Sequence, residues 1–192
     1  PQLYEFVKED APGVFARIRE RIKEGRWEAE GAMWLEPDCN ISSGESLIRH
    51  IIYGRRFFEQ ELGAEKNEVL WLPDVFGYSA ALPQILQKSG IPYFMTTKIG
   101  WNEFNRFPHD TFLWKGIDGT EVLTHLISTR NYQKPGDLKM VGNHSTTYNG
   151  LQNASQLMGT WQRYQDKDVS TEVLTCYGYG DGGGGPTEEM LE

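Results

Sequence analysis

The sequence is poor in cysteine, and it has no long apolar run. Its two cysteines, Cys39 and Cys176, lie far apart and form no CxxC pair, so neither a disulfide framework nor a cysteine-rich zinc site is indicated. No apolar run approaches the roughly 20 residues that a membrane-spanning helix needs, and no signal segment opens the chain. We therefore expect reduced thiols, no membrane partner and a cytoplasmic location.

Clustered positive charge and metal-binding histidine patterns are also missing. The chain has 27 acidic and 19 basic side chains, which gives a formal net charge of -8. Such a surface repels phosphate, so we expect no nucleic-acid partner. The four histidines show neither HxxxH nor HExxH spacing, so the sequence indicates no self-contained zinc site.

What the chain does contain is enough apolar material for a sizeable core. Of its 192 residues, 39% are hydrophobic and 12% are aromatic, which is typical of one domain or of part of a larger one. The chain begins at Pro1 without methionine, and it ends at Glu192 just after a Pro-Thr-Glu-Glu pattern that usually starts a helix. We therefore expect residues 1–192 to be part of a single domain with both ends truncated.

Periodicity predicts alternating helices and strands. The predicted helices are 3–25 with a break near Pro12, 45–62 between Ser43 and Gly63, 82–89 and 151–165. The predicted strands are 27–35, 69–72, 92–97 and 172–176, with a hairpin over 112–115 and 121–126 and a long polar loop over 128–150. This alternation favours an α/β fold with a mainly parallel sheet, either a barrel or a doubly wound sheet, with its active site at the carboxyl ends of the strands.

Two aspartates follow predicted strands at the carboxyl ends where we expect the active site. Asp74 comes two residues after Leu72, and Asp181 comes five residues after Cys176. Glycoside hydrolysis needs two carboxyl groups, one that attacks the sugar and one that donates a proton to the leaving oxygen. An aspartate in this position is, however, more often a helix cap or a turn residue.

Aromatic residues near the same strand ends favour a carbohydrate ligand, because flat rings pack against the apolar faces of sugars. They are Trp34, Trp71, Phe76, Tyr78 and Trp101, although Trp71 is more typical of a core residue. The glycine run 180–186 is not a phosphate loop. It lacks a following Lys-Ser/Thr pair and contains Asp181, which would repel phosphate, so we expect the glycines to allow a sharp turn around that aspartate.

Four segments carry a resemblance to a known family. They read WLPDVFGYSAALPQ at 71–84, WLEPDCNISSGES at 34–46, FMTTK at 94–98 and GYGDGGGGP at 178–186. In this order they resemble family 38 glycoside hydrolases, the α-mannosidases, and in particular the cytosolic and bacterial branch. The resemblance covers nearly the whole chain.

The resemblance implies a fold, a reaction and a metal. The fold would be an incomplete seven-stranded β/α barrel with mainly parallel strands flanked by helices. The reaction would be the removal of terminal α-linked mannose from oligosaccharides, with retention of configuration and a covalent glycosyl-enzyme intermediate. A divalent metal, zinc or cobalt, would lie at the floor of the sugar site.

The resemblance also assigns residue roles. Asp74 would be both the nucleophile and a metal ligand, and Asp181 is the candidate general acid/base. The substrate-binding positions are Phe76, Lys98, Tyr132, Trp34 and Asp38.

One departure from the family pattern limits this expectation. The family binds its metal through an early His-x-Asp pair and a later histidine, and no His-x-Asp occurs here. We therefore expect the remaining metal ligands outside residues 1–192 and expect this segment to be inactive by itself. The alternatives are a non-catalytic carbohydrate-binding α/β domain and, less favoured by Asp181, a doubly wound nucleotide-binding domain. A homo-oligomer is compatible with the sequence.

Overall fold

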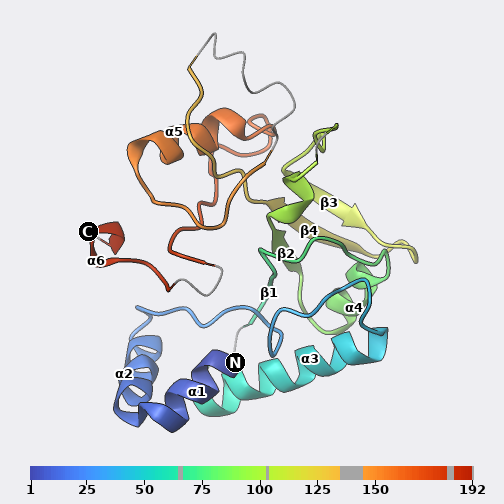
Figure 1. Ribbon diagram of the computed structural model, residues 1–192. Coiled ribbons are helices and arrows are strands. Elements are labelled where there is room, and N and C mark those ends of the chain that lie inside the picture. Colours follow the sequence, from blue (N-terminus) through green and yellow to red (C-terminus); the bar gives the residue numbers. More distant parts are fainter. Residues whose placement is uncertain (65–66, 103, 135–144, 181–183, 192) are drawn as a thin grey trace. The chain divides into compact units, whose positions relative to one another are not determined.

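The computed structural model in Figure 1 describes residues 1–64, 67–102, 104–134, 145–180 and 184–191. The chain divides into two compact units. Unit 1 comprises Pro1–Leu72, Gly77–Phe94 and Leu113–Leu123, and unit 2 comprises Pro73–Phe76, Met95–Phe112 and Thr124–Glu192. We describe each unit by itself.

The helices agree with the prediction. They are α1 (Gln2–Asp10), α2 (Pro12–Lys23), α3 (Gly44–Phe57), α4 (Leu82–Lys88), α5 (Ala154–Arg163) and α6 (Glu188–Leu191), with a π-helical turn η1 (Phe58–Leu62) and a 3-10 turn η2 (Lys98–Gly100). The break before Pro12 is confirmed, since proline starts α2 where its missing N–H costs nothing. Ser43 caps α3 by accepting a 3.2 Å hydrogen bond from the Ser46 amide. Gly63 ends η1 with a φ of 69°. In the part of the chain that the structure describes, no helix is long and apolar enough to cross a membrane.

The predicted mainly parallel sheet is confirmed. Its strands are β1 (Val69–Trp71), β2 (Tyr93–Thr96), β3 (Thr111–Lys115) and β4 (Glu121–Leu126), in the order β1-β2-β4-β3. In unit 1, the amide of Tyr93 donates to the Glu68 carbonyl, and in unit 2 the amide of Thr97 donates to the Pro73 carbonyl. Because both residue numbers increase together along this pairing, β1 and β2 run parallel. Strands β3 and β4 form the predicted antiparallel hairpin. The fold is therefore mixed α/β, with helices flanking a four-stranded sheet.

Two predicted strands are wrong. Residues 27–35 form only an isolated bridge between Gly31 and Leu70, because Ala32 has a φ of 61° and takes the backbone out of the extended conformation. Residues 172–176 form no strand either, and Tyr177 makes a single parallel bridge with Gly150. The segment around Gly150 pairs through this one residue, which is too little to extend into a β-ladder. The described parts of 128–150 contain no helix or strand, as predicted.

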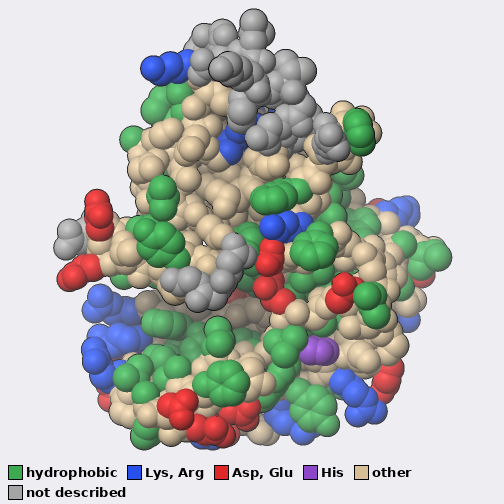
Figure 2. Space-filling model, in the orientation of Figure 1, with side chains coloured by type: hydrophobic (Ala, Val, Ile, Leu, Met, Phe, Trp, Pro, Cys, Tyr) green, Lys and Arg blue, Asp and Glu red, His purple; other side chains and the backbone are tan. Residues whose placement is uncertain are grey.

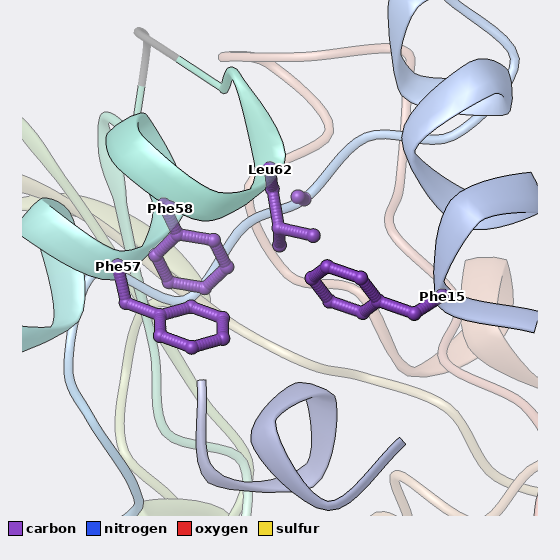
Figure 3. Packing of buried hydrophobic residues seen from close by; sticks show 5 residues of the cluster. Phe15, Phe57, Phe58 and Leu62 are labelled. Atoms are coloured by element: carbon purple, nitrogen blue, oxygen red, sulfur yellow. The ribbon is translucent and has the colours of Figure 1, made fainter. Parts of the chain in front are cut away.

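Aromatic packing holds the helices of unit 1 together. Phe15 of α2, Phe57 of α3, and Phe58 and Leu62 of η1 meet in one buried cluster (Figure 3). Phe58 is 1% exposed, and its ring lies edge-on to Tyr4 of α1, with 6.2 Å between centroids. This apolar cluster is what makes three otherwise polar, amphipathic helices a stable unit.

Helix α3 also passes very close to the chain at 32–34, and a glycine makes this approach feasible. A Cβ on Gly54 would lie 2.4 Å from the Ala32 carbonyl oxygen and 2.7 Å from the Trp34 nitrogen. These neighbours are backbone atoms that cannot move aside as a flexible side chain would. The position therefore requires glycine although it lies inside a helix.

We expect Gly54→Ala to destabilise the full-length protein by about 2 kcal/mol or more, because the added methyl group forces α3 away from the segment 32–34. Gly13→Ala is the matched control, since nothing lies within 4 Å of its Cβ position in α2. That variant should be neutral or more stable by about 0.5–1 kcal/mol, because alanine favours helix. Thermal unfolding followed by circular dichroism would measure both, and equal midpoints for the two variants would contradict the prediction.

The interior of unit 2 contains a buried polar network. Arg163 at the end of α5 and Asp110 form an ion pair with 3.1 Å between Nη1 and Oδ1, and both side chains are at most 3% exposed. Burial disfavours ionisation of Asp166, but hydrogen bonds from His109 and from the Thr111 and Asp110 amides outweigh it and lower the pKa of Asp166. These contacts tie the start of β3 to the end of α5.

Candidate active site

The candidate nucleophile lies where the paired ends of two parallel strands leave the sheet. In unit 2, the Thr97 amide donates a 3.2 Å hydrogen bond to the Pro73 carbonyl. This bond continues the pairing beyond the ends of β1 and β2 and places the residues after Pro73 and Thr97 side by side. These are Asp74 and Lys98, which the sequence separates by 24 positions.

Asp74 and Lys98 form an ion pair, with 3.0 Å between Oδ1 of the carboxylate and Nζ of the ammonium. The Asp74 side chain is 38% exposed, whereas the Lys98 side chain is 15% exposed. The carboxylate is thus accessible to a ligand while the ammonium that orients it is largely shielded. An accessible, oriented carboxylate is what a covalent attack on a sugar requires.

Two aromatic rings surround the ammonium of Lys98. Its Nζ lies 3.9 Å from the centroid of Trp101 and 5.5 Å from the centroid of Tyr148. The turn η2 brings Trp101 into place, because the Trp101 amide donates back to the Lys98 carbonyl at 3.0 Å. Cation–π attraction therefore reinforces the position that the ion pair with Asp74 gives to Lys98.

Both rings are themselves held by the segment 145–150. The Trp101 indole Nε1 donates a 2.6 Å hydrogen bond to the Thr146 carbonyl, and the Thr147 amide donates a 2.8 Å bond to the Thr129 carbonyl. Tyr148 follows directly in this segment. Trp101 was predicted among the aromatics near strand ends. Tyr148 was not predicted, because no local pattern marks a loop residue 50 positions from Lys98.

Phe76 and Tyr132, the predicted aromatic sugar contacts of unit 2, both offer exposed ring surface. Phe76 is 76% exposed and Tyr132 is 36% exposed. The Tyr132 amide donates to the Ser155 carbonyl at 2.9 Å. Gly159 allows α5 to come this close, since a Cβ there would lie 2.5 Å from the Tyr132 nitrogen. Exposed aromatic faces on anchored backbone suit contact with a sugar ring.

Trp34 and Asp38, the other predicted substrate contacts, belong to unit 1. Trp34 packs edge-on against Phe57 and, with Tyr53 and His50, lines a cavity of about 390 Å³. The carboxylate of Asp38 accepts 2.8 Å hydrogen bonds from the amides of Asn40 and Ile41, which is the geometry of an Asx turn. Asp38 thus has a local structural role in unit 1.

Two of the aromatic residues predicted near strand ends, Trp71 and Tyr78, differ from the prediction in their burial or contacts. Trp71 is 37% exposed, so the expectation of a core residue is wrong. Tyr78 packs edge-on against Phe94, with 4.9 Å between centroids, and its hydroxyl donates to the Leu72 carbonyl at 3.0 Å. Tyr78 therefore helps to build unit 1.

Asp181, the candidate general acid/base, lies outside the described residues. The strand expected before it is absent, as noted above, but the chain next to it does turn and pack closely. Gly178 has a φ of 112°, and a Cβ on Gly180 would lie 2.1 Å from the Asn149 side-chain oxygen. The turn that was expected around Asp181 itself lies outside the described residues and stays a prediction.

The described residues do not fit a complete metal site. Among them, no group of three or more His, Cys, Asp or Glu side chains is arranged to hold a metal ion. Asp74 is paired with an ammonium, which is no metal ligand.

If the full-length protein hydrolyses an aryl glycoside at this site, we expect Trp101→Leu to lower its kcat/KM by about 3- to 30-fold, because a shielded cation–π contact contributes about 0.5–2 kcal/mol. Trp101→Phe keeps an aromatic face while losing the hydrogen bond to Thr146, so it should retain most of the activity. Steady-state kinetics with a thermal-unfolding control would measure this. Equal losses in the two variants would mean that the hydrogen bond to Thr146, and not the ring over Lys98, positions the ammonium.

The chain is similar over its whole length to known proteins. Alpha-mannosidase G of Dictyostelium discoideum is 43% identical over 191 residues, covering 100% of this chain and 16% of that protein. The alpha-mannosidase of Saccharomyces cerevisiae is 40% identical over 192 residues, again covering 100% of this chain and 16% of that protein. The chain thus spans about a sixth of the length of these curated relatives.

The fold is similar to that of a solved structure. The crystal structure of 4-alpha-glucanotransferase from Thermococcus litoralis matches with a TM-score of 0.54 at 19% identity, over 66% of this chain and 20% of that chain. The family model described as the glycosyl hydrolases family 38 N-terminal domain matches residues 1–192. The chain therefore belongs to glycosyl hydrolase family 38.

Proposed function

We propose that this chain supplies the nucleophile region of a retaining α-mannosidase that removes terminal α-linked mannose from oligosaccharides. The observation that carries the proposal is the Asp74 carboxylate, accessible at the end of β1 and oriented by Lys98 at 3.0 Å. The family match over residues 1–192 and the names of the relatives, alpha-mannosidases, supply the substrate class.

In the proposed reaction, an oxygen of Asp74 attacks the anomeric carbon of mannose as the glycosidic bond breaks. Asp181 gives its proton to the departing oxygen, so the first product leaves as a neutral alcohol and the sugar becomes an ester of Asp74. Asp181 then takes a proton from water, whose oxygen attacks the same carbon and releases the Asp74 carboxylate. Two inversions give net retention. This mechanism requires the two carboxyl groups to lie about 5–5.5 Å apart.

Lys98 has a positioning role in this scheme. Because the Lys98 side chain is 15% exposed and its ammonium contacts Asp74 and two aromatic rings, it limits the rotation of the carboxylate. The proposed substrate contacts are Phe76, Lys98, Tyr132, Trp34 and Asp38. The exposed rings of Phe76 and Tyr132 support this role by stacking on sugar faces.

For the metal, we propose Asp74 as the one ligand that this chain contributes to a zinc or cobalt ion, with the other ligands outside the described residues. When bound, such an ion would act as a Lewis acid and take sugar hydroxyls as oxygen ligands. We further propose that the four-stranded sheet is part of an incomplete seven-stranded β/α barrel and that the protein acts in the cytoplasm.

The proposal is tested by incubating the full-length protein with nitrophenyl α-mannoside and following the first sugar product by proton NMR. A retaining α-mannosidase releases α-mannose before mutarotation, and preincubation with a chelator should lower the rate. Release of β-mannose would overturn retention. Binding of mannosides with no hydrolysis, with or without added zinc or cobalt, would instead establish the alternative of a non-catalytic carbohydrate-binding domain.

A further inference from the structure

Unit 1 contains a second feature that the proposed glycosidase reaction does not use. A cavity of about 510 Å³ opens between α3, the turn η1 and the end of α4. The apolar part of its lining consists of Ile48, Ile51 and Ile52 of α3. All of its lining residues belong to unit 1, and none belongs to the candidate active site.

The charged part of the lining is mostly positive. It consists of Arg55 and Arg56 of α3 and Lys88 of α4, whereas Glu59 is the one acidic side chain among the described lining residues. The cations therefore exceed the carboxylate by two charges, although the chain as a whole has a net charge of -8. Lys and Arg side chains are visible along α3 at the lower edge of Figure 2.

Two of these cations have no acidic partner among the described side chains. In the residues that the structure describes, neither Arg56 nor Lys88 forms an ion pair, while exposed cations elsewhere do, such as Arg49 with Glu45 at 2.8 Å. Arg55 is held by a hydrogen bond from its Nη1 to the Ser89 carbonyl, so its guanidinium is fixed at the pocket wall. Arg56 lies 5.9 Å from the centroid of the Tyr53 ring.

We propose that this pocket binds a small organic phosphate monoester. A phosphate monoester carries a charge of about -1.5 to -2 at neutral pH, which matches the excess of two positive charges. Guanidinium groups match phosphate oxygens with paired N–H donors, and a lysine adds a point charge. The isoleucine side chains of the lining contact the carbon portion of the ligand. The volume of the cavity lies within the roughly 300–1,000 Å³ typical of small-molecule sites.

The test uses the full-length protein and phenyl phosphate as the probe, with benzoate and inorganic phosphate for comparison. Isothermal titration calorimetry should show phenyl phosphate binding at least about tenfold more tightly than either comparison compound, because only phenyl phosphate combines the dianion with an apolar group. Equal binding of all three, or no binding of phenyl phosphate, would overturn the proposal.

The variant Arg56→Gln/Lys88→Gln should bind phenyl phosphate about tenfold or more weakly, since two charged donors are lost. The matched control is Arg49→Gln/Lys115→Gln, which removes the same charge from two exposed, ion-paired side chains outside the pocket. It should bind within about twofold of the unaltered protein. An equal loss of affinity in the control would contradict the proposed site, because binding would then depend only on the general attraction of an anion to positive charge.

A measurement on the unaltered protein does not depend on variant folding. Both Lys88 and Lys115 are exposed, so both should react with an amine-acetylating reagent. Phenyl phosphate should slow acetylation of Lys88 and leave Lys115 unchanged, as read by mass spectrometry of the digested protein. Equal rates at Lys88 with and without phenyl phosphate would contradict the proposed site. This measurement does not depend on mannoside hydrolysis, so a negative result would contradict the phosphate site without contradicting the proposed function.

Discussion

Asp74→Asn is expected to lower kcat of the full-length enzyme for nitrophenyl α-mannoside by about 10⁴-fold or more, in the range found when a nucleophile is removed from an enzyme. The carboxamide is nearly isosteric and can still accept a hydrogen bond from Lys98. It is, however, a poor nucleophile, and it carries no charge to stabilise the oxocarbenium-like centre. Steady-state kinetics would measure the loss.

Asp118→Asn is the control for this variant. Asp118 lies in the β3–β4 hairpin of unit 1, where its carboxylate accepts hydrogen bonds from the Thr120 amide at 3.1 Å and from the Gln84 amide group at 2.7 Å. An asparagine oxygen can still accept the bond from the Thr120 amide, and only the exposed bond from Gln84 is lost, so this variant should keep wild-type activity. Activity of Asp74→Asn within about tenfold of wild type would remove Asp74 from the nucleophile role.

Asp181→Asn is expected to have an effect that depends on the leaving group. A poor leaving group such as the sugar of a disaccharide needs a proton, so kcat/KM for a mannobiose should fall by about 10²–10⁴-fold. A dinitrophenolate leaves without protonation, so kcat/KM for dinitrophenyl α-mannoside should stay within about tenfold of wild type. The second step also loses its general base, so a burst of dinitrophenol should precede slow turnover.

Rapid-mixing kinetics and mass spectrometry of the quenched protein would test this prediction. The mass should increase by one mannosyl group on the peptide that contains Asp74. Asp168→Asn is the control, since Asp168 is exposed in the turn after α5. Equal losses for both leaving groups, with no burst, would show that another residue is the general acid and that Asp181 supports the site in a different way.

Local patterns were sufficient for most elements of the fold. The apolar stripe, the Ser43 cap and the Gly63 stop together predicted α3 and its continuation η1, because these signals act within a few residues of each other. The hairpin of β3 and β4 was predicted from its Asp118-Gly119 turn in the same way. The two strands that were wrongly predicted depended on something that is not local, since a strand exists only where a partner extends beside it.

Motifs that can be read along the chain were enough to indicate the family. Asp74, three residues after the short strand β1, with the segment Phe76-Gly77-Tyr78 after it, marked both the family and the candidate nucleophile.

The surroundings of that carboxylate depend on contacts between distant segments of the chain. Lys98 lies 3.0 Å from Asp74, and Trp101 and Tyr148 lie against its ammonium, because strand pairing and the carbonyl of Thr146 bring together segments that no periodicity connects. Such contacts follow from packing between distant parts of the chain, and a local pattern contains no information about them.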